Sequence, residues 1–552
     1  MDASQLLVST IAAPFFGALL VGSLSRLGRP VVRAAALAIT LLTLAGAVLL
    51  VVQFPADGLG AEHYAVSDWP WLGGSGAALN IRCSVGLDGL GLWLFGLTAL
   101  LLCSSVLVSW QAIEERPALF YGMLLLLEGG CLGVFSARDI VLFYVFFEFT
   151  LIPLFFLIGI WGSEERRLAA IKFFLFTLAG SVLTFLGLLA IVLWDYFHGS
   201  QQTLRFSIPE LTASLQAHPI RPLSGQLLIF WALFAGFAIK VPLFPLHTWL
   251  PLAHVQAPTA GSVVLAGILL KIGTYGFVRF SLPMLPEATA HALPWMLWLS
   301  VLGILYGALV ALAQHDLKRL IAYSSVSHMG FCMLGLFALN HLGVQGGTLQ
   351  MVNHGLSTGA LFALVGMLYE RYHTREIQQL GGLARRAPWL AFFMLLFTLS
   401  SIGLPGLNGF VGEFLVLLAA FQRTWTGISG AWELSLRAAA VLAVAGVVLG
   451  AWYMLWLYQR VFFGPLREPA ASGGEGRQHP GASRDLDWRE VLALTPLAVL
   501  VLWIGLQPGF FLDRMAPTLD ASVARAAQYV TATEVLAARP AELPSEAPDR
   551  GR

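Results

Sequence analysis

The sequence carries little charge for its length. Only 11% of its 552 residues are Asp, Glu, Lys or Arg, whereas 57% are hydrophobic. A soluble globular domain carries about 25% charged residues because water must wet its surface, so this composition excludes an ordinary soluble protein. The formal net charge of +1 provides no basic face, which argues against a nucleic-acid partner.

Cysteine is also scarce. The four cysteines lie far apart and form no CxxC motif, so they predict neither an iron–sulfur or zinc site nor a disulfide framework. Residues 1–5 lack the basic segment of a cleaved signal peptide. We therefore expect the first apolar block to persist as a membrane helix.

Long apolar blocks fill most of the chain. Stretches of roughly twenty apolar residues match the thickness of a bilayer core, and they lack the periodic polar positions of a soluble helix. The expected fold is an all-α integral membrane protein with about fourteen transmembrane helices, at 4–25, 31–53, 86–110, 118–136, 139–161, 170–194, 225–249, 258–280, 294–314, 320–340, 346–369, 389–421, 436–460 and 489–511.

Basic residues gather in alternate loops. The richer set of loops is expected to be cytoplasmic by the positive-inside rule, with both termini on the other side. It includes Arg26, Arg33, Arg166, Lys318, Arg371 and Arg460.

Lysine is rare even among the basic residues. Only Lys172, Lys240, Lys271 and Lys318 occur among 32 Lys and Arg, so arginine supplies positive charge wherever charge alone is needed. Lys240 and Lys271 nevertheless lie inside predicted spans, where a charge costs at least about 2.5–3.5 kcal/mol. Arginine keeps its proton under nearly all conditions, whereas a buried lysine can release one. This choice favours proton transfer over a static ion pair or a side chain that reaches the membrane surface.

Two acids lie inside predicted spans. Glu148 is flanked by aromatic residues and is too deep to reach either surface, so it must be protonated or paired with a cation such as Lys240. Glu128 lies near the end of its span, and packing explains it as well as function does.

Two predicted spans contain helix-breaking residues. The seventh holds Pro242 and Pro245, and the twelfth holds Pro405 in GLPGLNGFVGE. Interrupted helices at membrane depth must face protein or water, and they point to ion pathways. Spans four to eight and nine to thirteen form two five-helix units, and the odd number of spans inverts the second relative to the first. Packing kinks are the alternative.

Histidines lie near these elements. His328 and His354 fall within spans ten and eleven, and His247 and His254 follow the seventh span. A neutral imidazole donates and accepts at once, which suits a proton relay, although a lone membrane histidine is often a packing residue.

The motifs closely resemble those of the antiporter-like membrane subunits of respiratory complex I. The likeness extends from about residue 85 to 465, and it is nearest to the M-type subunits of bacterial NADH–quinone oxidoreductase because residue 413 is glutamate. It is carried by FFEFTLIPLFFLIGIWG, GFAIKVPLFPLHTWLP, APTAGSVVLAGILLKIGTYG, YSSVSHMGF, HGLSTGALFALVGMLYERYHTR and GLPGLNGFVGEF.

The resemblance implies a relay and an organisation. The implied proton carriers are Glu148, Lys240, Lys271, His328, His354 and Glu413, and the implied supporting residues are Lys172, Pro242, Pro245, His247, Pro405 and Glu128. The implied regions are the N-terminal helices (1–117), two antiporter-like repeats (118–285 and 286–463), and a cytoplasmic loop with the last span and a short tail (464–552).

The resemblance also implies partners and a location. We expect a multi-pass protein of the bacterial inner membrane that contacts lipids and other membrane subunits. Quinone, flavin and iron–sulfur clusters are expected on those other subunits, with no cofactor or metal on this chain. Members of the family often carry charged residues at the two positions where this sequence has Leu252 and Gln256. We therefore expect any role of acidic side chains at these positions to be absent or moved in this chain.

Two other classes share part of this pattern. One is a subunit of a multi-subunit sodium/proton antiporter or of a membrane-bound hydrogenase, against which Glu413 weighs. The other is a membrane haem protein with paired intramembrane histidines.

Overall fold

The computed structural model describes residues 2–538 except 59, 74–78, 200–202, 427, 429 and 470–484. The side chains of residue 61 and of residues 531–538 are also outside the described part. Much of the predicted loop at 464–488, and the end of the tail, therefore lie outside the described residues.

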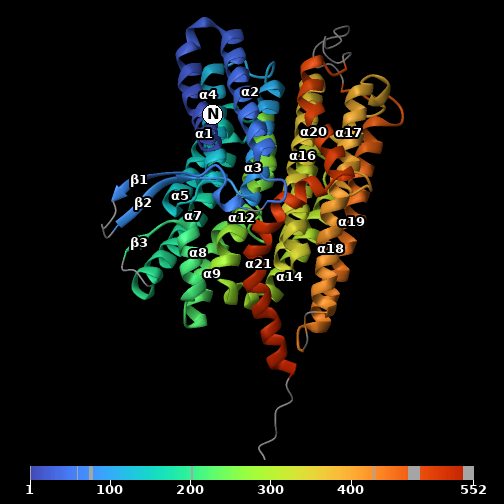
Figure 1. Cartoon of the computed structure of the whole chain (residues 1–552). Coiled ribbons are helices and arrows are strands. Elements are labelled where there is room, and N and C mark those ends of the chain that lie inside the picture. The colour runs from blue at the N-terminus through green and yellow to red at the C-terminus, as the bar shows by residue number, and fades with distance from the viewer. Residues whose placement is uncertain are drawn as a thin grey trace, which may run out of the picture.

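Thirteen helical segments in the described part of the chain are long and apolar enough to cross a membrane. Most are single helices: α1 (Ala3–Ser23, extended by η1, Leu24–Leu27), α2 (Arg29–Gln53), α3 (Gly89–Val108), α4 (Pro117–Ser136), α7 (Arg166–His198), α9 (Leu223–Lys240), α14 (Pro286–Leu312), α15 (Leu317–Phe337), α16 (His341–Tyr372), α19 (Glu433–Phe462) and α20 (Trp488–Leu506). Figure 1 shows them side by side, from α1 on the left to α19 on the right. The predicted helical membrane fold is confirmed.

Two segments are composite. One joins α5 (Ile140–Phe149) to α6 (Leu151–Trp161). The other runs through α11 (Thr259–Val264), α12 (Leu270–Gly276) and α13 (Leu282–Met284), which are separated by the π-helical turns η3 (Leu265–Leu269) and η4 (Phe277–Ser281). Such π-helical turns frequently occur at functional sites.

The two predicted interruptions are present. α9 ends at Lys240, and the chain continues through Pro242 and Pro245 before α10 (Trp249–Gln256) begins. The predicted span 389–421 is likewise divided into α17 (Pro388–Ser401) and α18 (Asn408–Thr426). Proline lacks an amide hydrogen and collides with the preceding turn, which explains why the helices stop here. Since neither α17 nor α18 qualifies alone as a span, the count of fourteen stays a prediction.

The loops separate into two ends. At the arginine-rich end, formed by loops 24–28, 109–116, 162–165, 313–316 and 373–387, Arg33 donates to the carbonyl of Ile113 and Arg375 to that of Val255. The opposite end carries a small sheet in which β1 (Ser67–Gly73) pairs antiparallel with β2 (Leu79–Val85), and β2 parallel with β3 (Leu204–Arg205). At the same end, the short helix α8 (Ile208–Ala217) follows β3, and the 3₁₀ turn η2 (Ala61–His63) precedes β1. Two further 3₁₀ turns, η5 (Ile377–Gln379) and η6 (Leu383–Arg385), lie at the arginine-rich end.

A last helix was not predicted from the sequence. Where we expected the end of a span and a short tail, α21 (Gly509–Ala538) crosses α14 and α16 (Figure 1). Its buried side chains Phe511, Met515, Leu519 and Val523 recur every four residues and face the helix bundle. Asp520 holds it to α16, since its Oδ1 lies 3.0 Å from His341 Nδ1 and 2.9 Å from Gln345 Nε2.

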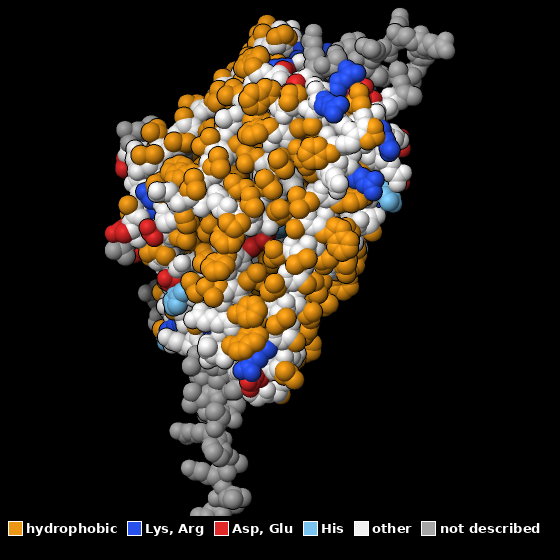
Figure 2. All heavy atoms as spheres, turned by 90° about the vertical axis from the view of Figure 1, so that its right-hand side faces the viewer, with side chains coloured by type: hydrophobic (Ala, Val, Ile, Leu, Met, Phe, Trp, Pro, Cys, Tyr) orange, Lys and Arg blue, Asp and Glu red, His pale blue; other side chains and the backbone are white. Residues whose placement is uncertain are grey.

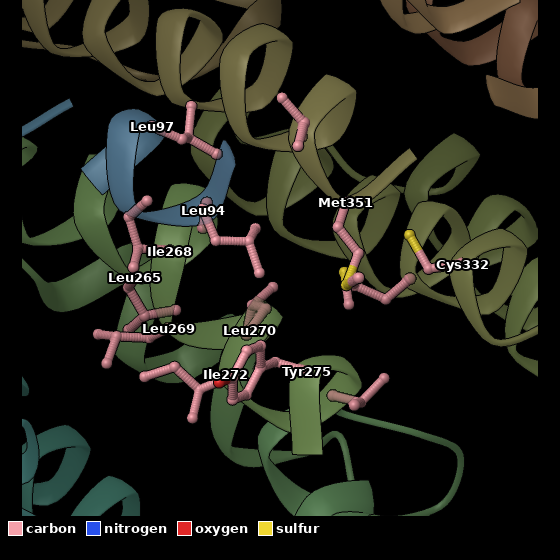
Figure 3. Packing of buried hydrophobic residues seen from close by; sticks show 14 of the residues in the cluster. Leu94, Leu97, Leu265, Ile268, Leu269, Leu270, Ile272, Tyr275, Cys332 and Met351 are labelled. Atoms are coloured by element: carbon pink, nitrogen blue, oxygen red, sulfur yellow. The ribbon is translucent and has the colours of Figure 1, made fainter. Parts of the chain in front are cut away.

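Burial differs sharply between helices. In the most apolar window of each helix, 94% of the residues of α3 and α15 are buried, and all of those of Thr259–Met284 and α16. Only 33% are buried in α1 and α2. Figure 3 shows Leu94, Leu270 and Met351 from three of the central elements packed together. Polar groups on these central helices are therefore shielded from lipid.

The outer surface is apolar. Figure 2 shows the side that carries α17 to α20, where hydrophobic side chains cover most of the face and most charged groups lie towards its two ends. Exposed side chains there include Phe392, Val448 and Trp452. A surface of this size and composition suits lipid or neighbouring membrane proteins.

Candidate functional site

Glu148 and Lys240 form the first part of the candidate site. α5 carries Glu148, and Lys240 is the last residue of α9, where the helix stops before Pro242. Lys240 is 3% exposed, and its ammonium lies 4.5 Å from the ring centre of Phe147. The two charged groups interact electrostatically, although no ion pair joins them directly within the described part of the chain. Glu148 and Lys240 are therefore near enough to interact, and the ring of Phe147 lies beside the ammonium of Lys240.

Lys271 lies at the centre of the bundle. It is fully buried in α12, and its ammonium lies 2.6 Å from Nδ1 of His354. The π-helical turn η3 explains its second contact, because Leu270 N–H donates to Leu265 O instead of Ala266 O. The Ala266 carbonyl is thereby available to accept from the Lys271 ammonium.

The line of polar groups continues from His354 to Glu413. The ring centres of His354 and His328 are 5.8 Å apart, and Nδ1 of His328 lies 3.3 Å from Oε1 of Glu413. Gln350 donates to the same carboxylate oxygen at 3.3 Å. Lys271, His354, His328 and Glu413 therefore come together as one buried series from α12, α16, α15 and α18.

The two parts of the site meet where α12 packs against the end of α9. A Cβ on Gly273 would lie 2.7 Å from the carbonyl oxygen of Phe237, so only glycine permits this approach. Phe237 is one turn before Lys240, and Gly273 is two residues after Lys271. The described contacts do not join the two lysines directly, and the link between them runs through packed helices.

The interruption between α17 and α18 is fastened to α16 by polar side chains. Asn353 donates to the carbonyl of Asn408 at 2.8 Å, and Ser400 donates to the side chain of Asn408 at 2.6 Å. The first bond joins a backbone carbonyl at the start of α18 to α16, and the second joins the side chains of α17 and α18 across the interruption. Gln350, Asn353 and Asn408 were not predicted as site residues, although the polar residues that cluster near His354 in the sequence were the available signal.

A small cavity lies among these groups. His328, His354, Asn353 and Ser401 line a space of about 10 Å³, which is close to the room needed for one water molecule. Nε2 of His354, Oδ1 of Asn353 and Oγ of Ser401 are buried and have no partner within the described residues. One water here could donate and accept between the two histidines.

Gly403 shapes the approach to Glu413. Its φ of +72° is a left-handed conformation that favours glycine, and a Cβ there would lie 2.9 Å from Oε2 of Glu413. The interrupted backbone therefore packs directly against the carboxylate of Glu413, a residue that is only 5% exposed.

The predicted supporting residues are dispersed. Lys172 lies over the ring of Phe176, and His247 lies 3.2 Å from the hydroxyl of Tyr306. Pro242 is buried, whereas Pro245 and Pro405 are exposed at their interruptions. Glu128 is fully buried in α4, and both of its carboxylate oxygens have no partner within the described residues. None of these residues belongs to the series from Lys271 to Glu413.

Gln256, at a position where the family often has a charged residue, makes hydrogen bonds of its own. The backbone and side-chain oxygens of Gln256 accept from the amides of Ser163 and Glu165 at 2.9 and 3.2 Å. This side chain thus secures the loop between α6 and α7. Leu252 is partly buried against the core.

Comparisons with known proteins agree with this geometry. Residues 137–436 match the family described as NADH:quinone oxidoreductase/Mrp antiporter, TM. NADH-quinone oxidoreductase subunit M of Rhodobacter capsulatus is 42% identical over 487 residues, which cover 88% of this chain and 89% of that protein. A chain of respiratory complex I from Thermus thermophilus is 35% identical, with a TM-score of 0.78 over 94% of this chain and 99% of that one.

A more distant structure shares the fold. A chain of the Mrp complex from Dietzia sp. DQ12-45-1b is 22% identical, with a TM-score of 0.75 over 96% of this chain and 99% of that one. The chain therefore belongs to the family of NADH:quinone oxidoreductase/Mrp antiporter membrane subunits, as an antiporter-like subunit of the M type.

Proposed function

We propose that this chain is a proton-translocating membrane subunit of NADH–quinone oxidoreductase in the bacterial inner membrane. The observation that carries the proposal is the buried series Lys271, His354, His328 and Glu413, since each member can exchange a proton with the next. Its membership of the family supports the same function. The energy comes from quinone reduction on other subunits, which carry the redox cofactors.

The first half of the relay consists of Glu148 and Lys240. When the carboxylate is near, it stabilises the charged lysine; when this interaction weakens, burial favours the neutral amine and releases the proton. Because Phe147 lies beside the ammonium and no direct ion pair forms among the described residues, small shifts of α5 change this interaction. The released proton passes towards Lys271.

The second half carries the proton to Glu413. The ammonium of Lys271 donates to Nδ1 of His354, whose other nitrogen faces the small cavity shared with His328. A proton released there reaches His328 and then the carboxylate that lies 3.3 Å away. Each transfer leaves its donor ready to accept the next proton, so the series works repeatedly.

The proposal includes an organisation of the chain. Residues 118–285 and 286–463 form two inverted antiporter-like repeats, each with one interrupted helix. Residues 1–117 supply additional membrane helices, and residues 464–552 supply a loop, α20 and α21. The exposed apolar faces contact lipid and neighbouring membrane subunits.

A sodium/proton antiporter subunit is the second candidate. Its support is the family description, which includes Mrp antiporters, and the shared fold of the Dietzia chain. Sodium dependence of ion transport in the purified complex would favour this candidate over the first. A haem protein is less well supported. His328 contacts Glu413 and His354 contacts Lys271, which favours a proton relay over axial ligation of haem. A purified sample with a Soret band would reverse that preference.

The decisive experiment replaces Lys240 in the assembled complex. Lys240→Ala should strongly reduce quinone-linked proton translocation, and Lys240→Arg should fail as well because arginine does not release its proton. Native gels establish that each complex is assembled. Normal turnover and a normal proton yield in an assembled Lys240→Ala complex would overturn the proposed function.

A further inference from the structure

A pocket lined by basic side chains lies at the arginine-rich end of α19. Its volume of about 620 Å³ is within the range of about 300–1,000 Å³ that is typical of small-molecule sites. Three stretches of chain enclose it: the turn after α14, residues 377–381 at η5, and the last turns of α19 with the segment that follows. No acidic side chain lines this α19 pocket among the described residues, and its polar lining consists of His315, Gln378, Gln459, Arg460 and Arg467.

Backbone hydrogen bonds fix the wall of the α19 pocket. Gly381 and Arg467 exchange two of them, at 3.1 and 2.9 Å, and the amide of Gly382 donates to the carbonyl of Phe463 at 3.1 Å. A Cβ on Gly382 would lie 2.8 Å from the carbonyl oxygen of Gly464, and the φ of Gly382 is +65°, so this close approach requires glycine. The wall that carries Arg467 is therefore fastened to the loop beside it.

The two arginines of the pocket have no acidic partner. Both side chains are exposed, and no ion pair involves Arg460 or Arg467 within the part of the chain that the structure describes. Of the acids next to the lining segments, Asp316 and Glu468 lie 3.5 and 3.7 Å from other arginines, and Glu376 does not line the pocket. An anion from outside the chain would therefore find two arginines available.

An apolar strip leads from the pocket along α19. Val448, Trp452 and Leu455 are exposed, and their spacing places them on one face of the helix. They belong to the apolar face that Figure 2 shows. Trp456 and the exposed Phe463 line the pocket itself, and aromatic residues at such positions are typical of the membrane–water interface. The pocket therefore lies where lipid headgroups are found, and the strip lies where acyl chains are found.

We propose that the α19 pocket binds the phosphate headgroup of an anionic phospholipid whose acyl chains lie along this strip. A guanidinium group can donate two parallel hydrogen bonds to phosphate oxygens, and Arg460 and Arg467 line one pocket. We expect the arginine-rich end to face the cytoplasm, and the cytoplasmic leaflet carries a negative surface potential from its anionic lipids. The site lies outside the relay and does not depend on proton translocation.

Two other occupants share part of this chemistry. A soluble phosphate would use the arginines, but it would give the apolar strip no role. An acidic segment of a neighbouring membrane subunit would also require an apolar surface beside its charge. A phospholipid is favoured because it carries an anionic group and apolar chains in the order in which the pocket and the strip are arranged.

The test uses the assembled complex, purified in detergent and supplied with phosphatidylglycerol that carries a photoreactive diazirine in one acyl chain. Irradiation should attach the lipid to the part of α19 that contains Val448, Trp452 and Leu455, as mass spectrometry of the peptides would show. Unlabelled phosphatidylglycerol should compete well, phosphatidylcholine with the same chains weakly, and an excess of inorganic phosphate not at all. Equal competition by phosphatidylcholine, or competition by inorganic phosphate, overturns the proposal. Absence of lipid from α19, with a neighbouring subunit cross-linked there instead, overturns it as well.

Two pairs of substitutions test the arginines. Arg460→Gln/Arg467→Gln removes both charges from the pocket, whereas the control, Arg319→Gln/Arg385→Gln, removes two exposed charges at the same end that do not line it. The concentration of phosphatidylglycerol that gives half-maximal labelling should rise by about fivefold for each pocket arginine, so by about thirtyfold for the pair. It should be unchanged in the control, and an unchanged concentration in the pocket variant overturns the proposal. Native gels establish assembly, and the competition measurement on the native complex does not depend on either variant.

Discussion

Replacing Lys271 with methionine removes the central proton carrier while preserving most of its volume. Lys271 is fully buried, and its ammonium contacts only the Ala266 carbonyl and Nδ1 of His354 among the hydrogen bonds of the described residues. Loss of the ammonium leaves these two acceptors without partners, at about 1–3 kcal/mol each. Removing a buried charge offsets much of this cost. We therefore expect an assembled complex.

The effect on transport should be larger than the effect on stability. A positioned acid–base group contributes about 10²–10⁴-fold to a proton-transfer step, which equals about 3–5 kcal/mol of barrier. With Lys271→Met, a proton has no carrier next to His354, and the other relay histidine is 5.8 Å from it between ring centres. Quinone-linked proton translocation should fall by about a hundredfold, the lower limit of that range.

The assay measures acidification of inverted vesicles during NADH oxidation by quinone. Native gels establish that the complex is assembled, and NADH oxidation by an artificial electron acceptor, which does not require the membrane helices, corrects for the amount of complex in each sample. Lys271→Arg should lower proton translocation as Lys271→Met does, because arginine retains the positive charge but does not release its proton. Translocation within a factor of about two of normal in assembled Lys271→Met complexes, far less than this contribution, would refute the reasoning.

Further predictions concern the surroundings of the relay. Asn408→Ala should reduce translocation with normal assembly, because the interruption before Glu413 loses the side chain that accepts from Ser400; proton yield per NADH measures this. Gly273→Leu should lower thermal stability by the equivalent of about 1–3 kcal/mol or prevent assembly, since its Cβ would collide with Phe237, as a native-gel melting series would reveal. Asp520→Ala should loosen α21 and increase its proteolysis without changing proton yield, because its contacts are with His341 and Gln345 and not with the relay.

The membrane fold and the interruptions were predictable because local chemistry determines them. Proline at 242 and 245 ends α9 whatever surrounds it, and the glycines around Pro405 break the twelfth span. Apolar length identified the spans in the same way. The sequence did not predict α21, because Asp513, Arg514 and Asp520 interrupt its apolar run, and only its spacing of four residues distinguishes it from a polar tail.

The site was predictable in its chemistry and less so in its contacts. Charged residues inside apolar spans can be recognised from the sequence as candidate site residues, because burying a charge in a membrane is costly and requires a reason. The expected close pairing of Glu148 with Lys240 is an electrostatic interaction without a direct ion pair among the described residues. The sequence predicts a loop position for Lys318, whereas the structure buries it. Its burial depends on the carbonyl of Ala257 at the end of α10, a contact that sequence spacing does not reveal.

The most direct test of the relay is the ratio of protons translocated to NADH oxidised by liposomes containing the assembled Glu413→Gln complex. Glutamine preserves the shape of the side chain and its contact with Gln350 but cannot carry a proton to the end of the series. The account predicts a lower ratio, a lower turnover, or both. An unchanged ratio at unchanged turnover would contradict it.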